Sequence, residues 1–294
     1  MSPLHLLISV LIMMVWGGNF AVMKTAIEYV PPFSLLALRY AVVALVLVPF
    51  IKVPRAHLKQ IFIYGFLMGG LHFGFIMTGL RYVDASTVAL LTQVGVPFST
   101  ILAAVIFKDY PGWRRWLGIG LAFVGAAVIA GEPRFEGDIL WIGMVIFAAL
   151  VWAVGNIQVK AMTGVDGLAL NGWMALFAFP MLAVWSLLFE EGQVDAYLAA
   201  PVIGGAALFY QSALVTLFGY GFWFWLMKKY QISLLMPFTL LGPTFGVAAG
   251  VMFLGEPMTY NMIVGGLMTL AGVGIIVLRR PTLLADTKRY KAEP

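Results

Sequence analysis

Few polar side chains interrupt the long apolar segments of this 294-residue chain, and five of them stand out: Asn19, Arg39, His72, Gln93 and Asn156. A charged side chain at the centre of a bilayer costs about 2.5–3.5 kcal/mol on insertion scales, and a buried polar group without a hydrogen bond is also costly. Each of these side chains therefore needs a partner, which is either a neighbouring helix or a bound solute. We treat the five as candidate ligands of a small-molecule substrate.

Two kinds of partner remain open for the amides and for the arginine. Asn19 and Asn156 either hydrogen-bond the substrate or join helices, at about 0.6 kcal/mol for an average contact. Arg39 lies about two turns inside its apolar segment. It either holds the carboxylate of an amino-acid-like substrate as a bidentate pair or extends outward to Glu28 or Asp84.

His72 is the histidine in the middle of an apolar segment, and imidazole titrates near neutral pH. No Asp or Glu lies in the middle of such a segment, so the usual carboxylate relay for protons is missing. His72 is thus either a proton-coupling residue or simply a hydrogen-bonded side chain, and uncoupled transport stays open.

Aromatic side chains form a second group of candidates. The group includes Trp16, Trp152, Tyr220 and Trp223, and the first three lie too deep, or too near the polar residues, to belong to the aromatic belts at the membrane interfaces. We predict that they line the wall of the same substrate cavity.

Three prolines lie inside apolar segments: Pro97, Pro237 and Pro243. A proline in a membrane helix frees a backbone carbonyl and bends the helix, which is tolerated where the backbone is buried in protein or lines a cavity. We predict that these prolines mark kinked helices that gate the cavity.

Composition defines the elements that must carry these residues. Hydrophobic residues make up 62% of the chain and charged residues 11%, with a mean hydropathy of +0.96, whereas soluble domains have about 25% charged residues. The apolar runs are unbroken rather than alternating, which excludes a β-barrel and predicts an all-α membrane protein. The absence of cysteine excludes disulfides and thiolate metal sites, and we expect neither a metal nor another cofactor.

Ten transmembrane helices are predicted, each about 20 residues long. Most of the 18 Lys and Arg residues fall in the connections on one side, which puts both termini in the cytoplasm by the positive-inside rule. The basic pI of about 9.4 therefore reflects topology and not nucleic-acid binding. The predicted helices cover 4–24, 33–51, 60–81, 85–107, 113–131, 138–160, 168–189, 200–227, 232–254 and 259–279.

The chain also repeats itself. The residues over 15–24, with Trp16, Asn19 and Lys24, return in altered form over 151–160, about 136 positions later. Five helices per copy is an odd number, so the second copy enters the membrane from the opposite face. We predict two inverted five-helix repeats, which is an arrangement used for alternating access. The domains are 1–131 for the first repeat, 138–280 for the second and 281–294 for a cytoplasmic tail.

These motifs resemble those of the EamA family in the drug/metabolite transporter superfamily. The segments over 16–24, 31–32 and 38–40 are similar to the family's opening, and those over 152–160, 219–221 and 254–259 to its second half. The pair Lys108-Asp109 departs from the family pattern after the fourth helix. Residues that match the family are Trp16, Asn19, Lys24, Arg39, Gly155, Asn156, Lys160, Tyr220 and Glu256.

The resemblance implies a transporter of the bacterial inner membrane that exports small amino-acid-like metabolites, most similar to O-acetylserine and cysteine exporters of the family. An aromatic amino-acid exporter or a broad drug/metabolite exporter of the same superfamily is the alternative. An intramembrane enzyme or a structural membrane subunit is the alternative of another class, but no nucleophile–base pair or H-E-x-x-H motif supports an enzyme. Expected partners are a small-molecule substrate and the lipid bilayer, with possible proton coupling, no nucleic acid, and a monomeric or homodimeric state.

Overall fold

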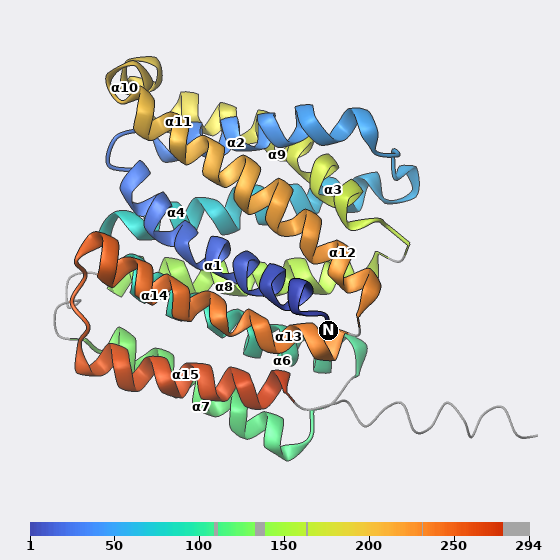
Figure 1. The fold of residues 1–294 in the computed structure, drawn as a ribbon, viewed down its shortest axis with the longest axis vertical. Helices are drawn as coiled ribbons and strands as arrows, with labels where there is room; N and C mark the ends of the chain where they lie inside the picture. The colour runs from blue at the N-terminus through green and yellow to red at the C-terminus, as the bar shows by residue number, and fades with distance from the viewer. Residues whose placement is uncertain (109–110, 133–138, 163, 231, 279–294) are drawn as a thin grey trace, which may run out of the picture.

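The computed structural model describes the chain except for residues 109–110, 133–138, 163, 231 and 279–294, so the predicted tail 281–294 lies outside the described residues (Figure 1). All regular secondary structure in the described part is helical. Nine helical runs there are long and apolar enough to cross a membrane, and Leu241–Leu254 is a shorter apolar helix. The chain is thus an all-helical, multi-pass membrane protein, as the sequence predicts.

The predicted helices correspond closely to the observed elements, although several spans contain more than one helical type. A short helix, α10, lies in the connection before residue 200, where the sequence predicts no helix. The elements are α1 (Pro3–Ala26), α2 (Pro32–Leu47), η1 (Val48–Phe50), η2 (Arg55–His57), α3 (Leu58–Tyr64), η3 (Gly65–His72), α4 (Phe73–Tyr82), α5 (Ala85–Leu91), η4 (Thr92–Val94), α6 (Gly95–Phe107), α7 (Trp113–Ala130), α8 (Ile139–Ala161), α9 (Gly167–Phe189), α10 (Gln193–Ala199), α11 (Pro201–Phe209), η6 (Tyr210–Tyr220), α12 (Gly221–Lys229), α13 (Ile232–Thr239), α14 (Leu241–Leu254) and α15 (Tyr260–Val277).

Two prolines account for the interruptions in the fourth and ninth predicted helices. The prediction of one continuous helix over 232–254 is wrong, because α13 ends at Thr239 and α14 begins at Leu241. Pro243 has no N–H to donate to the carbonyl four residues earlier, which is that of Thr239. Pro97 stands in the same relation to Gln93, which lies in the 3₁₀ segment η4.

Two spans contain π-helical segments. Gly65–His72 (η3) interrupts the span that runs from α3 to α4, and Tyr210–Tyr220 (η6) interrupts the span from α11 to α12. The π-helix is rare, appears mostly as an interruption of an α-helix, and is frequent at functional sites. Both segments supply side chains to the cavity described below.

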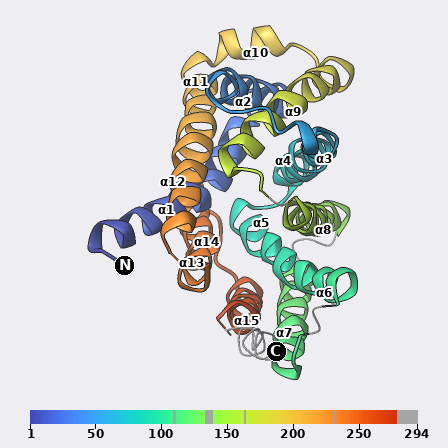
Figure 2. The ribbon, with the colours of Figure 1, turned by 90° about the vertical axis from the view of Figure 1, so that its right-hand side faces the viewer.

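The helices form a bundle with a pair at each end. α2 packs along α9 at one end, and α7 packs along α15 at the other (Figures 1 and 2). Between these pairs, α1 packs along α14 and the π-helical segment η6, while α8 packs along α4, α6 and η3. The N-terminus and the end of α15 lie at the same side of the bundle (Figure 1).

The α7–α15 pair approaches closely through glycine. A Cβ atom on Gly118 would lie 2.8 Å from the carbonyl oxygen of Gly272, and one on Gly272 would lie 2.5 Å from the carbonyl oxygen of Gly118. Small residues of this kind let membrane helices pack backbone against backbone. The two glycines therefore hold α7 and α15 together, and neither helix is among those that line the cavity described below.

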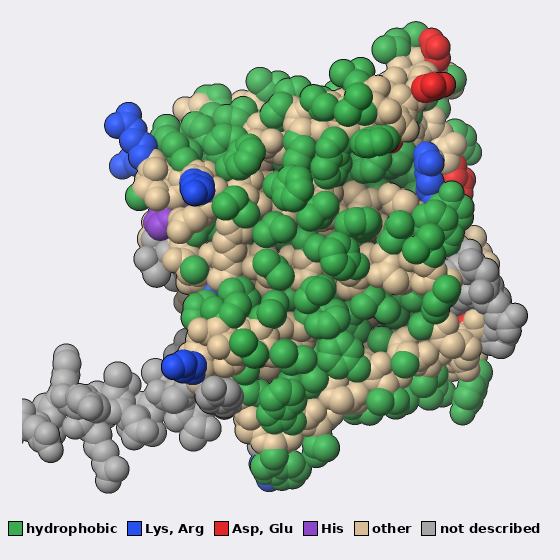
Figure 3. Space-filling model, turned by 180° about the vertical axis from the view of Figure 1, so that it is seen from behind, with side chains coloured by type: hydrophobic (Ala, Val, Ile, Leu, Met, Phe, Trp, Pro, Cys, Tyr) green, Lys and Arg blue, Asp and Glu red, His purple; other side chains and the backbone are tan. Residues whose placement is uncertain are grey.

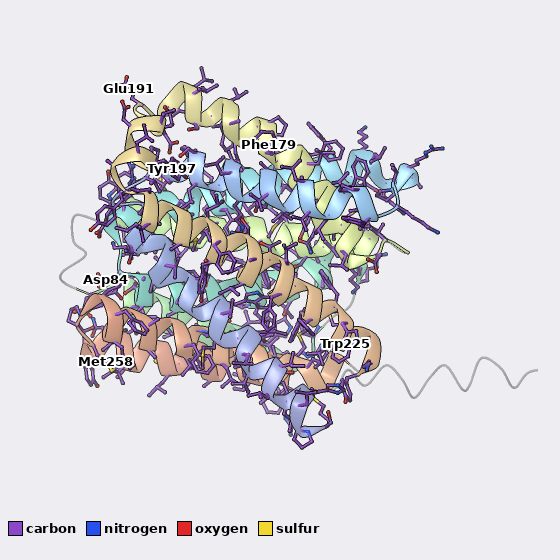
Figure 4. The ribbon with its side chains drawn as sticks, turned by 45° about the horizontal axis from the view of Figure 1, so that its top comes forward. Asp84, Phe179, Glu191, Tyr197, Trp225 and Met258 are labelled. Atoms are coloured by element: carbon purple, nitrogen blue, oxygen red, sulfur yellow. The ribbon has the colours of Figure 1, made fainter. Side chains whose placement is uncertain are left out.

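Charged side chains gather at two opposite edges of the bundle. Lys and Arg lie mainly at one edge, Asp and Glu at the other, and apolar side chains cover the surface between them (Figure 3). Asp84, Glu191 and Met258 lie at the edge opposite Trp225 (Figure 4). We call the edge with Asp84 and Glu191 the acidic edge. An apolar belt between two charged edges is the surface that a bilayer requires.

Two glutamates cap helices at the acidic edge. Glu256 is 7% exposed and accepts hydrogen bonds from the backbone N–H groups of Ala85 (2.6 Å) and Ser86 (2.9 Å) and from the Ser86 hydroxyl. Glu190 accepts from the N–H groups of Phe33 (2.7 Å) and Ser34 (3.0 Å). A carboxylate at a helix N-terminus satisfies orphan donors and opposes the helix dipole. Each cap joins the second half of the chain to a helix of the first half.

We expect Glu256→Gln to lower the thermal stability of the detergent-solubilised protein. The amide keeps the volume of the side chain but turns one hydrogen-bond acceptor into a donor that faces another N–H, at a cost of about 1.5–3 kcal/mol. Glu191→Gln is the matched control, because Glu191 is exposed at the same edge. Equal unfolding temperatures for the two variants would contradict a capping role for Glu256.

Gly118→Ala should also destabilise the protein, by about 1–3 kcal/mol, because the added methyl group overpacks the contact with α15. Gly120→Ala lies on the same helix, and its Cβ would meet nothing within 4 Å. Thermal unfolding of both variants checks the contact. A Gly118→Ala protein that unfolds no earlier than Gly120→Ala would show that the close approach is not needed.

Candidate substrate site

Arg39 is the buried cation at the centre of the candidate site. It lies on α2, and its side chain is 1% exposed. Nη1 donates to Oε1 of Gln211 and Nη2 donates to Oγ1 of Thr216, both at 3.3 Å. The alternative in which Arg39 extends outward to Glu28 or Asp84 is therefore wrong, because its guanidinium points toward η6 inside the bundle.

The partners of Arg39 are neutral. Its guanidinium carbon lies 4.7 Å from the ring centre of Phe73 and 5.3 Å from that of Tyr40, so cation–π contacts add to the two hydrogen bonds. Nε has no hydrogen-bond acceptor, and no carboxylate among the described residues pairs with the guanidinium. A buried cation without an anion is unfavourable, so this arrangement favours binding of an anionic group.

A cavity of about 50 Å³ adjoins the guanidinium, which is room for a few water-sized groups. Four spans contribute to it: α2, the span from α3 to α4, α9, and the span from α11 to α12. The lining is aromatic and apolar around a small number of polar side chains, and no described lining residue is acidic. The lining includes Arg39, Tyr64, Asn171, Thr216, Tyr220 and Phe224.

Arg39 and Tyr220 are the sequence candidates that the structure brings together at this cavity. Trp16 lies one layer behind, with its ring centre 4.9 Å from that of Tyr220 and its Nε1 donating to the carbonyl of Val215 at 3.2 Å. Trp223 does not line the cavity. It is 6% exposed in a separate apolar cluster with Ile12 and Met13, so its assignment to the cavity wall is corrected to a core position.

The two asparagines related by the repeat do not line the cavity, and they have different hydrogen-bond partners. Asn156 donates to the Ser99 hydroxyl at 3.5 Å, which joins α8 to α6. Asn19 donates to the sulfur of Met23 at 3.4 Å on its own helix, and its Oδ1 has no partner. Neither residue lines the cavity, so in this conformation the helix-joining interpretation fits Asn156 better.

The other candidates, His72, Trp152 and Gln93, lie on α8 or on segments that pack against it. His72 Nδ1 lies 2.9 Å from the carbonyl oxygen of Ala148. A carbonyl only accepts hydrogen bonds, so Nδ1 carries the proton of the neutral ring and Nε2 is left as the basic nitrogen. Trp152 packs against Gly95, where an added Cβ would lie 2.8 Å from its ring, and Gln93 is half-buried in η4.

The three predicted gating prolines lie in two spans beside these groups. Pro97 and Pro243 are buried and follow the helix interruptions described above, whereas Pro237 lies inside α13. Neither span contributes to the cavity lining. A gating role for the prolines stays a prediction.

Sequence reasoning missed most of the lining. Asn171 and Thr216 are polar residues inside apolar spans, so the rule that singled out Arg39 could have found them. Tyr64, Met68 and Phe224 carry no such signal, because aromatic and apolar residues are common throughout the chain. Their positions depend on the π-helical segments and on packing between distant spans.

The fold and the site define a class: a helical, multi-pass membrane protein with a buried cationic cavity between its spans. Comparison with known proteins is consistent with that class. The model of the EamA-like transporter family matches residues 4–131 and again residues 139–278, and the chain belongs to this family.

Individual relatives are transporters too. The chain is 28% identical to the "probable amino-acid metabolite efflux pump" of Salmonella typhimurium over 280 residues, which covers 92% of this chain and 93% of the relative. It is 27% identical to the "probable terminal-alkyne amino-acid exporter" of Streptantibioticus cattleyicolor, with 91% of each chain covered. A solved structure described as "Crystal structure of protein" has a TM-score of 0.56 and 17% identity, covering 96% of this chain and 99% of the other, and it shows a shared fold.

Thr216→Val should disturb the position of Arg39. The substitution keeps the shape of the side chain but removes the hydroxyl that accepts from Nη2, so the guanidinium is left with one neutral acceptor. We expect a loss of about 1–3 kcal/mol in the free energy of unfolding, measured by thermal unfolding. Thr244→Val is the control, since the Thr244 hydroxyl bonds only to the Leu240 carbonyl of its own helical run. Equal losses in both variants would contradict the proposed role of Thr216.

Proposed function

We propose that this protein is a secondary transporter that exports small amino-acid-like carboxylates across the bacterial inner membrane by alternating access. Membership of the EamA-like transporter family and relatives named as amino-acid metabolite and amino-acid exporters support the class of cargo and the direction. The excess of basic residues in the connections at one side supports the placement of both termini in the cytoplasm.

The observation that carries the proposal is the burial of Arg39 beside a cavity without a carboxylate partner. A guanidinium and a carboxylate match as a bidentate, charge-assisted pair. The carboxylate of the cargo would supply the anion that the protein itself does not, and this would fix its orientation in the cavity. Binding and orientation of cargo in this way need no chemical change.

Helix packing supports alternating access. The repeat-related pairs α2–α9 and α7–α15 pack against each other, as elements related by a two-fold axis do when they lie next to it. The repeat-related helices α1 and α8 each pack along the proline-interrupted span of the other half: α1 along α14, and α8 along α6. This pattern fits two inverted repeats over 1–131 and 138–280 that exchange inward-open and outward-open arrangements.

If export depends on a pH gradient, we propose that His72 couples the movement of protons to the movement of the cargo. Its Nε2 is the basic nitrogen of the neutral ring, and its ring centre lies 4.8 Å from that of Phe73, which also contacts Arg39. A protonated imidazole would add a second positive charge near the guanidinium, so protonation would change the affinity of the cavity for an anion.

Flux through proteoliposomes tests the function. We expect Arg39→Gln to reduce efflux of labelled amino-acid metabolites at least tenfold, because the substitution removes the charge that holds the carboxylate. Arg39→Lys should retain part of the activity, because it keeps the charge and loses the bidentate geometry. Arg81→Gln is the control, since Arg81 is an exposed arginine at the end of α4.

Each variant is first checked for folding by its elution as a single peak and by its unfolding temperature. Folded Arg39→Gln protein that exports as fast as Arg81→Gln would overturn the assigned site. Chemical conversion of the cargo, or no flux of any carboxylate in the wild type, would overturn the function. Repeating the assay with and without a pH gradient decides whether export is coupled to protons.

A further inference from the structure

The charge of the cavity points to a narrower class of cargo. We infer that it selects carboxylates that carry no free ammonium group, such as N-acylated amino acids and 2-oxo or 2-hydroxy acids, over zwitterionic amino acids. This inference rests on the proposed function and names the substrate class of the same site.

The charge around the cavity is not balanced. Its described lining contains one cation, Arg39, and no Asp or Glu. A carboxylate bound to Arg39 would make a neutral pair inside the apolar bundle. A zwitterion bound in the same way would bring an ammonium group as well, so the buried site would keep a net positive charge without a counterion.

The acidic residues of the described chain lie outside its transmembrane helices. No described transmembrane helix contains an Asp or a Glu. The carboxylates of the half-buried Glu190 and the buried Glu256 are held at the N-termini of α2 and α5, where backbone N–H groups occupy their oxygens. The described spans thus offer no carboxylate that an ammonium group of the cargo could reach.

Neutral side chains of the cavity can donate hydrogen bonds. Tyr40, Tyr64 and Tyr220 line it, and the buried Tyr40 hydroxyl has no hydrogen-bond partner among the described residues. A phenol hydroxyl donates readily to an acyl, keto or hydroxyl oxygen. The Asn171 amide donates to the carbonyl of Gly167 at 3.2 Å and has a second N–H to offer. These donors suit an oxygen next to the carboxylate better than they suit an ammonium group, which only donates.

Aromatic faces do not replace the missing acid. The rings of Tyr40 and Phe73 already face the guanidinium of Arg39. The remaining lining rings are those of Tyr64, Tyr220 and Phe224, and the last two lie 6.1 Å apart between centres at an angle of 27°. An ammonium group placed against them would gain a cation–π contact but would also lie near the guanidinium, which repels it.

A matched series of ligands tests the inference on the full-length protein. Alanine, N-acetylalanine, lactate and alanine amide share one small side chain and differ in charge, and the leucine series repeats the comparison with a larger one. Ligand-induced shifts in unfolding temperature measure binding, and counterflow in proteoliposomes measures transport. We expect the two anions to act at concentrations at least tenfold lower than the zwitterion, and the cationic amide to have no effect.

Two variants sharpen the result. Arg39→Gln should abolish the preference for the anions, whereas Arg81→Gln should keep it. Asn171→Asp places a carboxylate in the cavity lining, so it should reduce the ratio of anion to zwitterion affinity at least tenfold, while Asn171→Ser, which stays neutral, should preserve the ratio.

The outcomes separate the two proposals. If alanine or leucine binds as well as the acylated form in the wild type and Arg39→Gln abolishes both, the inference is wrong and the proposed function stands. If no ligand of either series binds or is transported, and Arg39→Gln changes neither binding nor transport, the assigned site is wrong. The inference is then wrong as well. An unchanged affinity ratio in folded Asn171→Asp protein would also overturn the inference.

Discussion

The burial of one positive charge among neutral groups is the constraint on which the rest of this structure depends. Arg39 is as buried as the aliphatic core around it, and its guanidinium has two long hydrogen bonds and two aromatic faces as partners. Desolvation of a cation is expensive, and neutral acceptors offset it only in part. A fold that keeps such a group must hold its hydrogen-bond partners firmly. Those partners, Gln211 and Thr216, come from a π-helical segment and lie 172 and 177 residues away in sequence.

The acidic residues show the complementary arrangement. Glu190 and Glu256 are buried or half-buried, yet both are committed to helix N-termini at the acidic edge rather than to the cation at the centre. A carboxylate that accepts several backbone N–H bonds is stabilised where it is. The same caps that fasten the two halves of the chain at one edge therefore also keep negative charge out of the middle of the bundle. Stability and site chemistry are thus served by one distribution of charge.

The long helices could be predicted from the sequence because their apolar runs are unbroken and end at Pro, Gly and charged residues. The interruptions near Gln93 and Thr239 were also accessible, since each lies four residues before a proline. The site was accessible only in part. Arg39 stood out because a charge at that depth needs a reason, whereas Tyr64 and Phe224 belong to residue types that are abundant throughout the chain. Trp223 has the same type and depth as a cavity residue but packs into an apolar cluster, and only the tertiary packing distinguishes the two environments.

The repeat in the sequence also predicted more symmetry at the site than the structure contains. Asn19 and Asn156 are related by the repeat, but neither lines the cavity. The cation comes from the first half of the chain, on α2, while its hydrogen-bond acceptors and the neutral donors Asn171 and Tyr220 come from the second half. Any movement of one half against the other must therefore change the coordination of Arg39. If the proposed carboxylate cargo competes for the same guanidinium, occupancy of the cavity and the relative position of the halves are thermodynamically linked. That linkage is what a transporter needs in order to move its cargo and its gates together.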